Sequence, residues 1–223
     1  MTDQSNATNQ QSWQRVAQAY AGDEVREDDP AMRRVLRDRF VERLGGKRVL
    51  ELGCGPGIDA VRMAERGLEV AATDYAPKFV EIVRARYPGL DVRLMDMTAP
   101  DLPPESFDGI YAFASFLHLP RSVADSTLAR LHELLVPGGL LSLWLIESSQ
   151  GIRDYTIDEW AGEAQCSMLF TCYPQQEIEE RLVAAEYAAV QFLPVPSSDA
   201  YEERPRLKDR GISSYQVFAR RDW

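Results

Sequence analysis

The residues best suited to chemistry are in a glycine loop, Gly53-Cys54-Gly55-Pro56-Gly57, which follows the apolar run Val49–Leu52. Such a loop lets a ligand approach the backbone closely, because glycine places no Cβ in its way. The helical pattern that begins at Ile58 would present free N–H groups in its first turn, which suit a phosphate or a carboxylate. The stretch therefore predicts a strand, a glycine turn and a helix, the first βα unit of a doubly wound α/β fold.

The spacing of the glycines excludes two common nucleotide-binding loops. A dinucleotide-binding loop has its third glycine five residues after the first, and Ile58 holds that place here. A Walker A loop needs Gly-Lys-Ser/Thr, which this loop lacks. The third glycine is instead Gly57, four residues after Gly53.

An acidic residue ends the second predicted strand. Asp74 follows Leu68–Thr73 and lies 21 residues after Gly53. A carboxylate at this place can accept hydrogen bonds from both hydroxyls of a ribose, as it does in dinucleotide-binding folds. The alternative is an aspartate that only caps the helix beginning at Pro77. The neighbouring glycine loop favours the ribose role.

A second acidic residue, Asp96, ends the strand Val92–Met95 and precedes Met97. Its carboxylate could accept the exocyclic N–H of an adenine while Met97 covers the ring. The alternative is a loop aspartate beside a core methionine. Because ligands bind outside the carboxyl ends of the strands in open α/β sheets, we expect Glu51, Asp74 and Asp96 to line one crevice.

The elements that position these residues alternate between strand and helix. Four further strands are expected at Phe107–Ala114, Leu140–Ile146, Ala188–Leu193 and Ser214–Ala219. This alternation predicts an α/β protein with a mostly parallel sheet.

The length of 223 residues fits one domain. Residues 1–11 are polar and aperiodic, so we expect a disordered tail there and a single domain over residues 12–223. Within that domain, residues 12–45 are predicted to form helices that cover the ligand. Residues 148–172 and 194–211 have no clear period and are expected to be insertions around an acceptor pocket.

The composition argues against several classes of function. A net charge of −10 disfavours electrostatic binding to the phosphates of a nucleic acid. Three cysteines without a C-x-x-C pair, together with two histidines, predict neither a metal site nor a disulfide framework. The chain has no apolar run of about 18 residues and no leader pattern at its start, so we expect a cytoplasmic protein without membrane contact.

The motifs match one family in order and spacing. E-L-G-C-G-P-G resembles motif I, (D/E)-x-G-x-G-x-G, of the class I S-adenosylmethionine (SAM)-dependent methyltransferases. The segments VAATD, DM, FDGIYAFAS and LVPGGLLSLWL extend the resemblance over residues 47–147. The likeness is to small bacterial enzymes that act on metabolites. It implies a doubly wound, seven-stranded sheet with helices on both faces and an antiparallel last strand. It also implies SAM as cofactor and S-adenosylhomocysteine as product.

The resemblance assigns roles along the crevice. The glycine-loop residues would face the methionine part of SAM, with Glu51 beneath its ammonium group. Asp74 would hold the ribose, with Tyr75 beside it. Asp96 and Met97 would hold the adenine. The cofactor site implied in this way consists of Tyr20, Glu51, Gly53, Cys54, Gly55, Gly57, Asp74, Tyr75, Asp96, Met97 and Ala114. Tyr20, on the amphipathic face of a short helix, could equally be an ordinary packing residue.

His118 is the best candidate for an acid–base residue, because it follows the fourth strand and its side chain titrates nearest pH 7. A structural histidine is the alternative. Arg121 could bind an acidic substrate or merely form an ion pair. Tyr173 is the other candidate for a substrate contact.

The predicted function is methyl transfer from SAM to an O or N atom of a small-molecule acceptor, by in-line displacement and without a metal. The alternatives are a SAM-binding regulatory or partner subunit without activity, and a protein methyltransferase. We expect a monomer or a homodimer. The sequence does not identify the acceptor.

Overall fold

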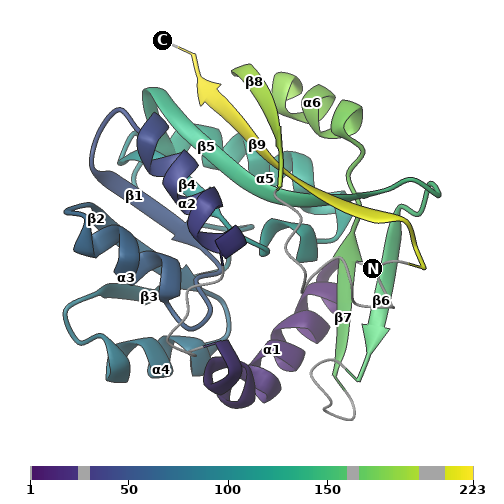
Figure 1. Cartoon of the computed structure of the whole chain (residues 1–223), viewed down its shortest axis with the longest axis horizontal. Coiled ribbons are helices and arrows are strands. Elements are labelled where there is room, and N and C mark those ends of the chain that lie inside the picture. The colour runs from purple at the N-terminus through teal and green to yellow at the C-terminus, as the bar shows by residue number, and fades with distance from the viewer. Residues whose placement is uncertain (1, 25–30, 160–165, 196–208, 223) are drawn as a thin grey trace.

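The computed structural model describes residues 2–24, 31–159, 166–195 and 209–222. Its centre is a seven-stranded sheet in the order β3-β2-β1-β4-β5-β9-β8 (Figure 1). The strands are β1 (Arg48–Leu52), β2 (Glu69–Asp74), β3 (Asp91–Leu94), β4 (Phe107–Ala112), β5 (Leu135–Ser148), β8 (Tyr187–Pro194) and β9 (Ile212–Arg221). Strands β1 to β5 are parallel, and β9 is antiparallel to both β5 and β8. The predicted sheet with an antiparallel last strand is confirmed.

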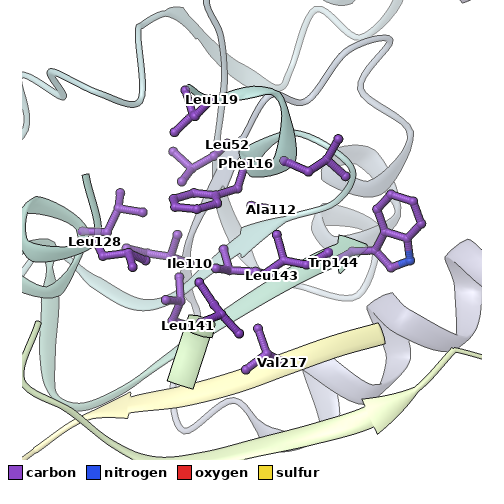
Figure 2. Close-up of a cluster of buried hydrophobic side chains, with 14 of the residues drawn as sticks. Leu52, Ile110, Ala112, Phe116, Leu119, Leu128, Leu141, Leu143, Trp144 and Val217 are labelled. Atoms are coloured by element: carbon purple, nitrogen blue, oxygen red, sulfur yellow. The ribbon is translucent and has the colours of Figure 1, made fainter. Parts of the chain in front are cut away.

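Both faces of the sheet are buried. Successive residues of a strand point to opposite faces, so burial of both faces places them in two different clusters. Val49 and Tyr111 belong to one buried cluster, and their neighbours Leu50 and Ile110 belong to the other. Figure 2 shows the second of these clusters. The helices that cover the sheet are α2 (Ala31–Arg43), α3 (Ile58–Glu65), α4 (Pro77–Arg86), α5 (Arg121–Leu134) and α6 (Gln175–Ala184). Burial on both faces explains why the parallel strands are near-continuous apolar runs.

The fifth strand is longer than predicted. It begins at Leu135, whereas the sequence predicts a turn over residues 136–139 and a strand from Leu140. The pairing of β4 with β5 shifts register between Phe107 and Gly109, so an irregularity in the ladder accommodates the Pro-Gly-Gly stretch.

A small unit lies beside the carboxyl edge of the large sheet. It consists of the antiparallel pair β6 (Asp154–Asp158) and β7 (Ser167–Thr171), together with α1 (Thr2–Glu24). Helix α1 lies between β7 and α4 (Figure 1). Strands β6 and β7 fall in the stretch 148–172, for which the sequence showed no clear period.

Helix α1 corrects the expectation of a disordered tail over residues 1–11, since it begins at Thr2. Its packing here is polar: the Asn9 and Ser12 side chains are both 2% exposed and both hydrogen-bond to β7. An apolar period could not reveal a contact of this kind. Most of the predicted insertion 194–211 lies outside the described residues, as do residues 160–165.

Candidate active site

A cavity opens at the carboxyl edge of the sheet, between the loops that follow β1, β2, β3 and β4 and the helices α1 and α2. Its place agrees with the rule that ligands bind at this edge of an open α/β sheet. The lining residues are Trp13, Tyr20, Arg33, Gly53, Cys54, Gly55, Pro56, Asp74, Tyr75, Phe79, Met95, Asp96, Met97, Phe113, Ala114, Ser115, His118 and Leu119. Ten of the predicted site residues are therefore brought together.

The three loop glycines serve different purposes. At Gly53, with φ +66°, an added Cβ would lie 2.4 Å from the Cβ of Ser115, so this glycine allows the loops after β1 and β4 to touch. At Gly55, with φ +51°, an added Cβ would meet no atom within 4 Å. Gly57 does not line the cavity, and its Cβ position lies 3.1 Å from Val83 of α4. Only Gly55 thus leaves open space on its side-chain side.

Asp74 ties the glycine loop to the start of α4. Its Oδ2 accepts the Gly55 N–H at 2.9 Å and its Oδ1 accepts the Ala76 N–H at 2.9 Å. Burial raises the pKa of the Asp74 carboxyl to about 6, against the opposing effect of these N–H groups. Each carboxylate oxygen retains acceptor capacity, so the capping role and a ligand role are compatible.

Asp96 and Met97 line the next part of the wall. One Asp96 oxygen, Oδ1, accepts the Thr98 N–H at 2.9 Å and the Thr98 hydroxyl at 2.8 Å. Tyr75 lies beside them, and burial raises the pKa of its phenol, which keeps the hydroxyl neutral. A carboxylate, a flexible thioether and a phenol together form a wall that suits a planar, polar-edged ring.

The loop after β4 carries backbone strain at the cavity. Ala114 has φ 50°, in the left-handed region that residues with a Cβ rarely adopt. The next residue holds the turn, since the Ser115 hydroxyl donates to the Leu52 carbonyl at 2.6 Å. Such strain clusters at ligand sites, where the surrounding structure enforces it.

Arg33, for which the sequence motifs predicted no role, lines the cavity from α2. Its Nε donates to Asp59 Oδ2 at 2.7 Å, and its guanidinium lies 4.7 Å from the centre of the Phe113 ring. Arg37, one turn later, donates to Asp59 Oδ1 at 2.8 Å. The available signal was the spacing of four between the two arginines together with the acid in the first turn after the glycine loop.

Glu51 lies next to this charge cluster but does not line the cavity. Its side chain is 1% exposed, and among the described residues its Oε2 has no hydrogen-bond partner. Burial and the charge of Asp59 raise the pKa of Glu51 well above its usual range, while Arg33 and Arg37 oppose the rise. A buried oxygen without a partner is costly, so this atom can take a donor that arrives with a ligand.

Aromatic rings from α1 and α4 close the other side. Trp13 and Tyr20 meet edge to face at 5.3 Å between ring centres, and each lies about 6 Å from the ring of Phe79. Tyr20 therefore packs against other aromatic rings, as the packing interpretation expected, and it also lines the cavity. Trp13, seven residues earlier on the same helix face, was not assigned to the site.

His118 ends the short 3-10 helix Phe116–His118 and is 8% exposed. Its Nδ1 lies 2.8 Å from the Leu169 carbonyl oxygen. Because a carbonyl only accepts, Nδ1 carries the proton and Nε2 is left as the acceptor. The ring meets those of Trp13 and Phe170 edge to face, at 5.5 and 4.8 Å. Burial lowers the pKa of His118 to about 4, so the imidazole is neutral at pH 7.

Arg121 and Tyr173 are not at the cavity, which corrects the expectation that they contact substrate. The Arg121 guanidinium forms an ion pair with Glu177 and donates to the Cys172 carbonyl at 2.7 Å. It also lies 4.9 Å from the centre of the Tyr173 ring, which is fully buried. Both residues join β7 to α6 and have a packing role.

Two further properties concern the described ranges only. Within them, no three His, Cys, Asp or Glu side chains are grouped in a way that could bind a metal ion. None of the helices seen there has the length and apolar character needed to span a bilayer.

Comparison with known sequences bears on what this cavity holds. Residues 49–139 match the family model described as a methyltransferase domain. The magnesium-protoporphyrin O-methyltransferase of Rhodobacter capsulatus is 34% identical over 99 residues, which cover 42% of this chain and 43% of that protein. The match thus spans less than half the length of this curated relative.

Solved structures share the fold. The 1,6-didemethyltoxoflavin-N1-methyltransferase of Burkholderia thailandensis, solved with its substrate and S-adenosylhomocysteine, superposes with a TM-score of 0.73. It is 23% identical, and the match covers 100% of this chain and 91% of that one. A 4+2 cyclase has a TM-score of 0.66 at 21% identity, covering 84% and 80% of the two chains. The same fold therefore carries more than one activity.

Proposed function

We propose that this chain, which matches the methyltransferase domain model over residues 49–139, transfers a methyl group from SAM to an O or N atom of a small molecule. The observation that carries the proposal is the meeting of Gly55, Asp74, Asp96 and Arg33 in one cavity. Each supplies a contact that a different part of SAM needs.

The residues fit the adenosine part. Asp74 has acceptor capacity for both ribose hydroxyls beside the two N–H groups that it already binds. Asp96 would accept the exocyclic amine of the adenine, with Met97 and Tyr75 against the ring and the ribose. These are the roles that the sequence motifs predict, and the shared cavity supports them.

The residues also fit the methionine part. Arg33 would bind the carboxylate, for which a guanidinium is well shaped, while Asp59 holds it from behind. The Ala114 carbonyl would face the ammonium group, as would Glu51 Oε2, which has no hydrogen-bond partner among the described residues. A cation arriving next to Glu51 would favour ionisation of that buried acid. The open side of Gly55 leaves room for the chain between the two ends.

Bound SAM supplies an activated methyl group on a sulfonium, so the chain itself needs to align an acceptor and manage one proton. His118 would accept that proton or hold it by a hydrogen bond through Nε2. A neutral imidazole with a pKa near 4 is a weak base, so it suits acceptors with an acidic proton, such as an enol, a phenol or a ring N–H. Trp13, Phe79 and Phe113 favour a flat, largely apolar acceptor.

The experiment is transfer of a labelled methyl group from SAM to a panel of flat acceptors with O–H or N–H groups. We expect turnover that falls about a hundredfold in His118→Ala with SAM affinity unchanged, because proton transfer contributes about a hundredfold or more. Tight SAM binding without turnover on any acceptor would instead favour a non-catalytic subunit. Turnover only on protein substrates would favour a protein methyltransferase.

A further inference from the structure

The candidate base is joined to the N-terminal helix through one amide. Asn9 Nδ2 donates to the His118 carbonyl at 2.7 Å, and Asn9 Oδ1 accepts the Leu169 N–H at 3.0 Å. Leu169 in turn accepts from His118 Nδ1 at 2.8 Å. The three residues thus form a closed ring of hydrogen bonds, which we call the Asn9 ring.

The Asn9 ring fixes the orientation of every group in it. The Asn9 amide cannot be reversed, because its NH2 would then face the Leu169 N–H and its oxygen would face the His118 carbonyl. Asn9 is 2% exposed, so water does not compete freely for these bonds. By holding the backbones of residues 118 and 169 together, Asn9 keeps the Leu169 carbonyl aimed at Nδ1.

Ser12 provides a separate contact between the same helix and the same strand. Its hydroxyl donates to the Ser167 carbonyl and accepts the Ser167 N–H, each at 3.0 Å. Ser167 and Leu169 are two residues apart on β7, so both use the edge that does not pair with β6. The Ser12 side chain therefore docks α1 onto β7 and, within the part of the chain that the structure describes, does not bond to His118, which makes it a matched control.

We propose that Asn9 is a positioning residue for His118: by docking α1 it sets the Nδ1–H tautomer and turns Nε2 toward the acceptor. The inference rests on the proposed function, in which Nε2 meets the proton of the acceptor. It also explains why α1 carries both Asn9 and the cavity aromatics Trp13 and Tyr20. The helix that covers the cofactor region is the one that orients the base.

The test is nitrogen NMR of the imidazoles in the full chain, labelled with 15N-histidine. The chain has two histidines, so His132 serves as an internal reference. We expect His118 to be in the Nδ1–H form in the wild-type protein. Asn9→Ala and Asn9→Asp should lower the ratio of this tautomer to the Nε2–H form at least about threefold, because each loses the donor to the His118 carbonyl. Ser12→Ala should leave the ratio unchanged.

An unchanged tautomer in both Asn9 variants would overturn the proposal. So would an equal shift in Ser12→Ala, since docking in general would then be responsible. Calorimetric titration with S-adenosylhomocysteine separates this outcome from the cofactor assignment: affinity should change less than about threefold in Asn9→Asp. With an acceptor from the panel, Asn9→Asp should lower kcat about tenfold and leave KM for SAM nearly constant.

Discussion

The two walls of the cavity are built by different means. The wall at the sheet edge consists of strand ends and backbone turns, with Asp74 bonded to the N–H groups of Gly55 and Ala76. The opposite wall is formed by α1, which side chains such as Asn9 and Ser12 hold against backbone far away in sequence, including that of β7. The first wall thus depends on contacts between neighbouring strand ends, such as Asp74 with Gly55 19 residues away, while the second depends on contacts between segments up to 160 residues apart.

The largest expected effect comes from removing the carboxylate of the sheet-edge wall. Asp74→Ala should weaken SAM binding about a hundredfold, because two hydroxyls lose a charged acceptor. Calorimetric titration measures it. Asp108→Ala is the matched control: Asp108 Oδ2 also accepts two backbone N–H bonds, from Lys47 and Arg48, but at the other edge of the sheet. Asp108→Ala should lower the free energy of unfolding and leave the affinity for SAM unchanged. If both variants lost affinity equally, the loss in Asp74→Ala would reflect folding and not a contact with SAM.

Two groups that line the cavity, Asp74 and His118, should respond to acid in opposite directions. The pKa of Asp74 is raised to about 6, so its contribution to stability is full below its unfolded value and is lost as pH rises through 6. The pKa of His118 is lowered to about 4, so its contribution is full above its unfolded value and is lost as pH falls toward 4. Between about pH 4 and pH 6 the two slopes should largely cancel.

Urea unfolding at several pH values tests this cancellation. Relative to the wild type, Asp74→Asn should raise the slope of stability against pH of the unliganded protein by about 1 kcal/mol per pH unit in this range, because the falling contribution of Asp74 is removed while those of His118 and Glu51 stay. His118→Gln should make it fall by a similar amount. Parallel curves for the two variants and the wild type would contradict the assignment of these pKa shifts.

A substitution of Arg33 separates binding of the methionine carboxylate from binding of the adenosine part. Arg33→Lys should weaken binding of S-adenosylhomocysteine about tenfold, because lysine lacks the planar fork that fits a carboxylate. Binding of 5′-methylthioadenosine, which has no carboxylate, should be unchanged. Arg37→Lys is the control, because Arg37 also pairs with Asp59 but does not line the cavity. It should change the affinity for both ligands less than about twofold. Loss of both ligands in Arg33→Lys would place the arginine elsewhere.

The smallest effect is expected from Ser12→Ala, which removes two hydrogen bonds of the second wall. Their loss should cost about 1 kcal/mol locally. Amide hydrogen exchange at Ser167 should quicken while the exchange of β1 stays the same. Quicker exchange throughout the sheet would mean that α1 supports the fold itself and not only the wall.

The sequence predicted the first wall because its signals are local. A glycine turn and an acid at a strand end are each recognised within a few consecutive residues, and Asp74 and Asp96 were predicted from their positions after the apolar strand runs. It did not predict the second wall, because Asn9 and Leu169 are 160 residues apart and are joined by one side chain. Arg33 escaped notice for a related reason, since a buried ion pair leaves no apolar period.

The two predicted substrate contacts that do not line the cavity show that spacing alone does not determine where a side chain points. Arg121 and Tyr173 lie on segments that the topology brings near the sheet edge, yet their side chains turn to Glu177 and to the core. Rotamer and packing decide between a ligand contact and a structural one, and neither is visible in spacing.

Calorimetric titration of the wild-type chain with SAM and with NAD shows most directly whether this cavity holds SAM. We expect one SAM site, competed by S-adenosylhomocysteine, and no heat from NAD, since Ile58 replaces the glycine that a dinucleotide loop needs. Binding of NAD without binding of SAM would contradict this expectation.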